Sequence, residues 1–161
     1  MIQDQLEKYF QKYYHVCSRV AFTMIKNRAD AEDIAQEVLL RLLLYQPEFK
    51  NEEHEKAWMI RTAINLCKDL LKSKWHTSTV GMETLPGAGE PYLQETFLEG
   101  DDTLGAVLEL PERYRNCLYL FYYEDYSIRE IAGILEAPEN TVKTNLKRGR
   151  EALKQKLLER R

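Results

Sequence analysis

The segment from Tyr126 to Arg150 constrains the fold most, because it reads as two short helices separated by a turn that contains proline. The first half repeats apolar residues at i, i+3, i+4 and i+7, which is one face of a helix: Ile128, Ile131, Ala132 and Leu135. Pro138 interrupts this pattern, since proline is tolerated only before or within the first turn of a new helix. A second apolar face follows at Val142, Leu146 and Leu153. The sequence therefore predicts a helix-turn-helix.

The second helix of this motif is basic away from its apolar face. Its polar side chains there are Lys143, Thr144, Lys147, Arg148 and Arg150. Lysine and arginine hold phosphates, and arginine can also pair two donors with a guanine edge in the major groove. A solvated helix face explains this cluster poorly, because positive charge near a helix start is unfavourable unless an anion is bound. We interpret the helix as a candidate DNA-recognition helix.

The formal net charge of −3 conceals an uneven distribution of charge. Residues 139–161 carry eight basic and three acidic side chains, and residues 57–76 carry four basic and one acidic. Residues 30–55 carry eight acidic and two basic side chains, whereas residues 77–104 carry six acidic and no basic ones. This pattern favours a chain that touches a polyanion at two places and proteins elsewhere, and it argues against a uniformly basic architectural DNA-binding protein.

Three helical patterns fill the first half of the chain. The first runs from Leu6 to about Lys26, the second from an expected N-cap at Asp30 to Pro47, and the third from Ala57 to Leu71. Three helices of this size can form one small bundle. No segment alternates with period two for long enough to be a convincing strand.

The organisation of the whole chain follows from the segment between the two helical halves. Residues 77–100 hold four of the seven glycines and two of the five prolines, without helical periodicity. Helices resume with a short one from Asp101 through Leu110 and another opened by Pro111. We predict an all-α fold with an N-terminal helical bundle (1–76), a flexible acidic linker (77–100) and a C-terminal helix-turn-helix domain (101–161).

The third helix carries a tryptophan among hydrogen-bonding and basic side chains: Trp58, Arg61, Thr62, Asn65, Lys68, Lys72 and Lys74. Such a surface could hold single-stranded bases and their backbone. Trp58 alone is more typical of a core residue, and we expect it in the core. Phe49, in the polar loop before this helix, is either a cap on the bundle or a platform on which a base stacks.

No enzyme site, metal site or cofactor site can be named in the sequence. Asp33 and Glu37 are one helical turn apart, but no histidine or glycine-rich phosphate loop accompanies them, so a solvated or protein-binding face is the better interpretation. The three cysteines, Cys17, Cys67 and Cys117, form no CxxC motif, and the three histidines are isolated. We expect buried free thiols, no cofactor, no small-molecule substrate and no catalytic activity.

The chain shows neither a signal peptide nor a membrane span. Its first residues are polar and acidic, and no apolar run approaches the roughly 20 residues that cross a bilayer. We therefore expect a cytoplasmic, reduced protein.

With these residues identified, the chain resembles the extracytoplasmic-function (ECF) group of bacterial sigma-70-type sigma factors over nearly its whole length. Asn27 to Leu43 is similar to the helix of that family that binds core RNA polymerase. Ala57 to Lys74 is similar to the helix that recognises and melts the promoter −10 element. Leu110 to Leu153 is similar to the domain that reads the −35 element. The three motifs in this order, around an acidic linker, are strongly specific.

The resemblance implies a role for each matched position. The positions that would face the clamp helices of the largest polymerase subunit are Asp33, Gln36 and Glu37. Those that would hold flipped −10 bases or support that strand are Phe49, Arg61, Asn65, Lys68 and Lys72. Those that would contact the −35 major groove are Lys143, Thr144, Lys147 and Arg148. The implied function is to direct core RNA polymerase to specific promoters, under the control of an anti-sigma factor.

Three features depart from the family pattern. Glu136 stands where the family often has glycine, which is tolerable if the turn avoids left-handed dihedral angles or accepts some strain. Asn145 stands where the family often has arginine, and asparagine could read adenine bidentately. Residues 46–55 are more acidic than a strand-binding loop would suggest.

Two other functions remain open. A stand-alone helix-turn-helix regulator would bind duplex DNA tightly without polymerase, and it would leave the acidic segment from Asp30 to Leu43 unexplained. An all-helical adaptor that binds only protein would keep its activity when Lys143, Lys147 and Arg148 are changed to alanine.

Overall fold

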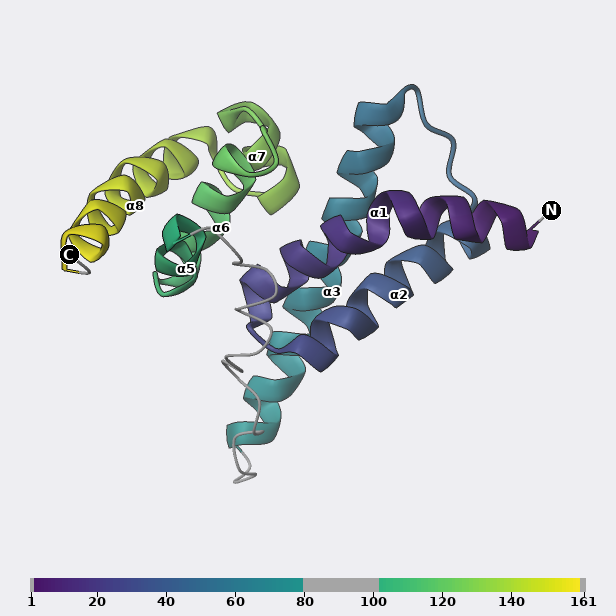
Figure 1. Ribbon diagram of the computed structural model, residues 1–161, viewed down its shortest axis with the longest axis horizontal. Coiled ribbons are helices and arrows are strands. Elements are labelled where there is room, and N and C mark those ends of the chain that lie inside the picture. The colour runs from purple at the N-terminus through teal and green to yellow at the C-terminus, as the bar shows by residue number, and fades with distance from the viewer. Residues whose placement is uncertain (1, 80–101, 160–161) are drawn as a thin grey trace. The chain divides into compact units, whose positions relative to one another are not determined.

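The computed structural model describes residues 2–79 and 102–159, and in these ranges it consists of α-helices and short connections (Figure 1). The chain divides into two compact units, residues 1–90 and 91–161. The prediction of an all-α fold with two helical regions is thus confirmed. Of the segment predicted as a linker, residues 77–79 continue a helix, and residues 80–100 lie outside the described part of the chain.

Unit 1 is a bundle of α1 (Ile2–Ile25), α2 (Arg28–Tyr45) and α3 (Glu52–Thr79), in which α1 packs against both other helices (Figure 1). Its most completely buried side chains come from all three helices: Cys17, Ala21, Phe22, Ala35, Val38, Met59, Ile60, Ala63, Ile64 and Cys67. α3 approaches the α1 backbone closely at Cys67, whose Sγ lies 4.0 Å from the Ala21 carbonyl oxygen. The larger side chains fill the remaining space, as close packing of a protein interior requires.

The turn between α1 and α2 corrects one prediction. Asn27, not Asp30, is the N-cap of α2: it has extended backbone angles, and its Oδ1 accepts a hydrogen bond of 3.1 Å from the Asp30 amide. Asp30 lies in the first turn, where a carboxylate is favoured by the positive end of the helix dipole. Lys26 ends α1 in the left-handed region with φ 54°.

Unit 2 contains α5 (Asp102–Leu108), α6 (Glu112–Tyr122), α7 (Ile128–Leu135) and α8 (Glu139–Glu159). The predicted apolar faces of the helix-turn-helix point inward, with Ile131, Val142 and Leu146 almost completely buried. α8 comes close to α6 at Gly149, because a Cβ atom at that position would be 3.1 Å from Leu118 Cδ1 and 3.2 Å from Tyr114 Cβ.

Both ends of α7 are defined by local hydrogen bonds. Ser127 and Glu130 form a capping box, with bonds of 3.1 Å from the Glu130 amide to Ser127 Oγ and of 3.0 Å from the Ser127 amide to Glu130 Oε1. At the other end, Glu136 adopts a left-handed conformation with φ 56° and ψ 47°. Of the two possibilities open from the sequence, the turn therefore accepts strain at Glu136 rather than avoiding it.

The three cysteines are free thiols in the interior of the helical units, each at most 1% exposed. Burial raises the pKa of the Cys117 thiol to about 11, an effect that a hydrogen bond with the side chain of Asn145 partly offsets. A thiolate, which is the reactive form, is therefore scarce at Cys117 below strongly alkaline pH.

Replacing Glu136 by glycine is expected to stabilise unit 2 by about 1 kcal/mol, because glycine adopts left-handed dihedral angles without the clash of a Cβ atom. Urea unfolding followed by circular dichroism measures this change. Glu136→Ala is the matched control, since it removes the same charge but keeps the Cβ atom. Equal stabilisation by both variants would show that charge, not backbone conformation, is responsible.

The thiols are expected to resist alkylation in the folded chain at pH 8. For Cys117 the raised pKa alone lowers the thiolate fraction by about two orders of magnitude, and burial blocks access to all three sulfur atoms. The measurement is the rate of labelling by a thiol reagent, with the urea-unfolded chain as the reference that labels three sites. Labelling of any cysteine at the unfolded rate in native buffer would contradict the buried positions.

Candidate DNA-binding and protein-binding surfaces

The outer face of α8 carries the residues predicted to contact duplex DNA. Lys143, Thr144, Lys147 and Arg148 are all exposed, whereas Val142, Leu146 and Gly149 on the other side of the helix are buried. The structure thus brings the four predicted −35 residues onto a solvent-facing surface in the first half of one helix. Such a helix half has the chemistry to meet phosphates and base edges in a major groove.

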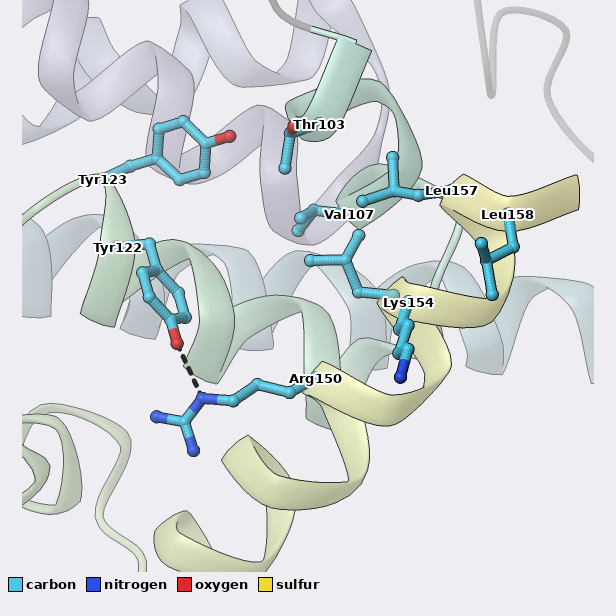
Figure 2. Close-up of a pocket in the computed structure, with 9 residues that line it drawn as sticks. Thr103, Val107, Tyr122, Tyr123, Arg150, Lys154, Leu157 and Leu158 are labelled. Carbon is cyan, nitrogen blue, oxygen red and sulfur yellow. Dashed lines mark hydrogen bonds between the residues drawn. The ribbon is translucent and has the colours of Figure 1, made fainter. Parts of the chain in front are cut away.

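Arg150 differs from these four residues because it is attached to α6. Its Nε donates a hydrogen bond of 2.6 Å to Tyr122 Oη (Figure 2). Its guanidinium group lies 5.5 Å from the ring centroid of Phe121 and 5.7 Å from that of Tyr122. This contact is a cation–π interaction supported by a hydrogen bond. It could not be predicted from the sequence, where Arg150 follows Lys143 and Lys147 as one more basic residue of the helix.

Asn145 is half-buried, and its side chain is engaged with Cys117 of α6. A side-chain amide that makes this inward contact does not present its donor and acceptor together to a base. The contact therefore argues against the hypothesis that Asn145 reads adenine.

One face of α3 unites four of the five residues predicted for the −10 element. Arg61, Asn65, Lys68 and Lys72 follow one another at spacings of four, three and four residues, which places them in one stripe along a helix. Arg61, Asn65 and Lys72 are exposed, and Lys68 is half-buried. This face is basic and polar, as a surface for a single strand requires.

The same stripe continues toward the start of α3 through Trp58 and His54, which lie three and seven residues before Arg61. Trp58 is half-buried, so the expected core position is wrong. The alternation of three- and four-residue spacings from His54 to Lys72 was the signal in the sequence that could have placed both residues on this face.

Phe49, the fifth predicted −10 residue, packs at the end of this stripe. Its ring meets the His54 ring edge-on, with centroids 5.5 Å apart and planes at 89°, and the Trp58 ring at 6.0 Å and 64°. Phe49 is half-buried. Its partners are thus aromatic rings on the basic face of α3.

Two of the acidic side chains between residues 46 and 55 form ion pairs with a lysine of α1. Lys12 Nζ lies 3.0 Å from a carboxylate oxygen of Glu52 and 3.3 Å from one of Glu55, and the Tyr13 hydroxyl donates to Glu55. The bond with Glu52 is the main cause of a raised Lys12 pKa, and burial is the main cause of a raised Tyr13 pKa. These two carboxylates are therefore paired within unit 1 and add less negative charge next to the basic face of α3.

The predicted polymerase-binding residues surround a groove of about 510 Å³ between α1 and α2. Asp33 and Gln36 are exposed, and Glu37 is half-buried and pairs with Arg41 at 3.2 Å. The apolar side chains that line the same groove are Leu6, Phe10, Leu39, Leu40 and Leu43. Half-exposed Phe10 and Leu40 beside a polar rim are typical of a surface that binds another protein.

Unit 2 has a second apolar groove, of about 680 Å³, that the sequence reading missed. Its lining comes from α5, from the end of α6 with the residue that follows it, and from α8 (Figure 2): Thr103, Val107, Tyr122, Tyr123, Arg150, Leu153, Lys154, Leu157 and Leu158. In the sequence, the apolar stripe of α8 continues through Leu153 and Leu157, which indicated that this end of the helix packs against something. The groove could not be predicted from this stripe, because it forms only where three helices meet. Tyr122 and Leu158 are each about half exposed.

The described residues contain neither a metal-binding cluster nor a helix that could span a membrane. No group of three or more histidine, cysteine, aspartate or glutamate side chains in residues 2–79 and 102–159 could hold a metal ion. Within the same ranges, no helix combines the length and the apolar character that crossing a membrane requires.

Comparisons with known proteins identify the family of the chain. The family description "Sigma-70 region 2" matches residues 9–77, and "Sigma-70, region 4" matches residues 102–153. The chain is 31% identical to the ECF RNA polymerase sigma factor SigW of Bacillus subtilis over 167 residues, covering 96% of this chain and 87% of that protein. It is 32% identical to the RNA polymerase sigma factor SigV of the same organism over 130 residues, covering 81% and 77%.

The fold is also similar to a solved sigma factor. The sigma factor RpoE of Bartonella quintana, crystallised with the anti-sigma factor NepR, superposes with a TM-score of 0.73 at 16% identity, covering 95% of this chain and 96% of that one. The sequence relationships and the two family matches together identify the family. This chain belongs to the ECF group of RNA polymerase sigma factors.

Proposed function

We propose that this sigma factor uses its two units for different parts of a promoter, with unit 2 reading the −35 element and unit 1 holding unpaired bases of the −10 element. The observation that carries the proposal is the presence of two separate basic faces, one on α3 and one on α8, in units that match different sigma-70 regions. The proposed boundaries are 1–76 and 101–161, with residues 77–100 between them.

The α8 face supports recognition of duplex DNA. Lys143 and Lys147 carry point charges suited to phosphates, and Arg148 can pair with phosphate or with a guanine edge. Thr144 adds a hydroxyl that can donate or accept. The attachment of Arg150 to Tyr122 anchors this helix to α6 two residues beyond Arg148.

The α3 face supports capture of a single strand. The Asn65 side-chain amide can bond to a base edge. Arg61, Lys68 and Lys72 lie along the same stripe, where they can contact the phosphate backbone of the strand. The edge-on contact of the Phe49 ring with Trp58 supports a role for Phe49 in stacking on an unpaired base. Opening the duplex costs a few kcal/mol per unstacked base, and capture of the base by such a site offsets that cost without ATP.

The groove of α1 and α2 supports contact with core polymerase through Asp33, Gln36 and Glu37. These polar side chains surround exposed Phe10 and Leu40. The apolar side chains offer area to bury against a partner, and the carboxylates offer negative charge to basic side chains of that partner. Because core polymerase acts in the cytoplasm, we place the protein there. A sigma factor forms part of the polymerase holoenzyme, so we assign no reaction to this chain by itself.

An anti-sigma factor is the proposed regulator. The structural relative RpoE was solved with the anti-sigma factor NepR. The present chain offers two apolar grooves, one in each unit, that a helical inhibitor could cover. Covering the α1–α2 groove would block the polymerase-binding residues directly.

The stand-alone regulator is less well supported than this proposal. It gives no role to the acidic rim and exposed apolar side chains of the α1–α2 groove. It also gives no role to the second basic face, on α3.

Changing Lys143, Lys147 and Arg148 together to alanine is expected to reduce promoter-specific initiation by about 100-fold, because each lost contact to phosphate or base weakens binding. The measurement is run-off transcription with bacterial core polymerase on a promoter mapped with the unaltered chain. Footprinting should show loss of protection near −35, while binding to core polymerase is unchanged.

Lys156→Ala is the matched control, since Lys156 is a basic residue of the same helix that faces Glu109 at 3.9 Å. It should initiate at the unaltered rate. Normal initiation by the triple variant would favour the adaptor function and contradict the assignment of the α8 face.

A further inference from the structure

The loop from residue 46 to residue 51, which joins α2 to α3, is fixed at both ends by backbone hydrogen bonds. Gln46 takes the left-handed conformation with φ 44°, and its amide donates to the Leu42 carbonyl at 3.0 Å. At the other end, Asn51 Oδ1 accepts a hydrogen bond of 2.8 Å from the His54 amide, and the Asn51 carbonyl accepts one of 3.1 Å from the Glu55 amide. Asn51 thus acts as a cap on α3.

His54 adds a contact to the middle of this loop. Its Nδ1 accepts a hydrogen bond of 3.2 Å from the Lys50 amide. Since Nδ1 accepts, the ring proton resides on Nε2. The Lys50 amide directly follows Phe49, so the imidazole fixes the backbone next to the aromatic side chain and also meets its ring edge-on.

The helix that carries His54 is itself attached to α1. Glu55, the next residue, accepts from Tyr13 and pairs with Lys12, which also pairs with Glu52. Tyr13 is only 3% exposed, so this attachment is anchored in the core. The first turn of α3 therefore holds the His54 imidazole in a defined place relative to the bundle.

We propose that His54 is a positioning residue for −10 recognition: by accepting the Lys50 amide, it holds Phe49 beside Trp58 in the orientation in which an unpaired base can stack. This inference rests on the proposed function of the α3 face. A loop of this length would otherwise have to be ordered when the strand binds, and that ordering would weaken binding. His54 removes this cost by ordering the loop beforehand.

The two contacts of the imidazole, with the Lys50 amide and with the Phe49 ring, can be tested separately, because different substitutions preserve them. Asparagine at position 54 can place Oδ1 near the position of Nδ1 and so keep an acceptor for the Lys50 amide. Phenylalanine keeps a ring for Phe49 but has no acceptor. Alanine keeps neither contact.

The experiment measures binding of a fluorescent single-stranded oligonucleotide, the non-template −10 strand of a promoter mapped with the unaltered chain, to the complex of this chain with core polymerase. His54→Ala is expected to weaken binding by about tenfold, within the range that loss of one stacked base produces. His54→Asn should bind within about threefold of the unaltered chain, since it keeps an acceptor. His54→Phe should resemble His54→Ala.

A double-mutant cycle with Phe49→Ala distinguishes positioning from a general loss of structure. If His54 acts through Phe49, His54→Ala should weaken binding little further when Phe49 is already alanine. Additive losses would overturn the proposal. So would unaltered binding by His54→Ala, or full binding by His54→Phe.

Two controls separate the failure of this inference from the failure of the proposed function. Glu53→Ala, an exposed neighbour in the same turn, should leave binding unchanged, and all variants should still bind core polymerase and duplex −35 DNA. If the unaltered complex shows no preference for the mapped −10 strand over a scrambled strand, the assignment of the α3 face fails. If the unaltered complex prefers the mapped −10 strand, and the His54→Ala complex binds that strand with the same affinity, only the role of His54 fails.

Discussion

The close approach of α8 to α6 at Gly149 is the constraint on which the arrangement of unit 2 depends. A Cβ atom at this position would lie only 3.1 Å from Leu118 Cδ1, so any other residue would require the Leu118 side chain or the helix to shift by a few tenths of an ångström. This crossing directs Val142 and Leu146 inward and leaves the basic side chains of the same turns in solvent. The contact of Arg150 with Tyr122, one residue later, supports the same orientation. The exposed basic face of α8 is thus a consequence of core packing.

Unit 1 uses its charges in two different ways. The carboxylates of Glu52 and Glu55 are engaged by Lys12 and Tyr13, so they serve to attach α3 to α1. The basic side chains of Arg61 and Lys72 remain exposed on the same helix. A net charge of −3 is therefore compatible with the basic faces of α3 and α8, because it is the local distribution of charge that attracts a polyanion.

Apolar periodicity was sufficient to predict the helices, the helix-turn-helix and the division into two helical regions. It was sufficient because a helix buries its apolar residues along one side, as Ile131 of α7 and Leu146 of α8 do. Periodicity was not sufficient to find the first residue of a helix: Asp30 was expected to cap α2, but the bond from the Asp30 amide to Asn27 Oδ1 shows that Asn27 is the cap. The position of Trp58 was predicted wrongly because an aromatic residue among apolar neighbours resembles a core residue until the neighbouring loop is placed.

Other features depend on the path of the backbone in turns and loops, or on contacts between helices, and periodicity contains neither. The left-handed conformation of Glu136 arises from the turn that joins α7 and α8. The bond from the Lys50 amide to His54 arises from the path of a loop, and the groove of unit 2 arises from three helices together.

The most direct test of the central claim is in vitro transcription from a pool of promoter fragments, with bacterial core polymerase in the presence and absence of this chain. The account predicts discrete start sites that appear only with the chain and that share two sequence elements at −35 and −10. The absence of chain-dependent start sites, together with tight binding of the chain alone to duplex DNA at physiological salt, would contradict it.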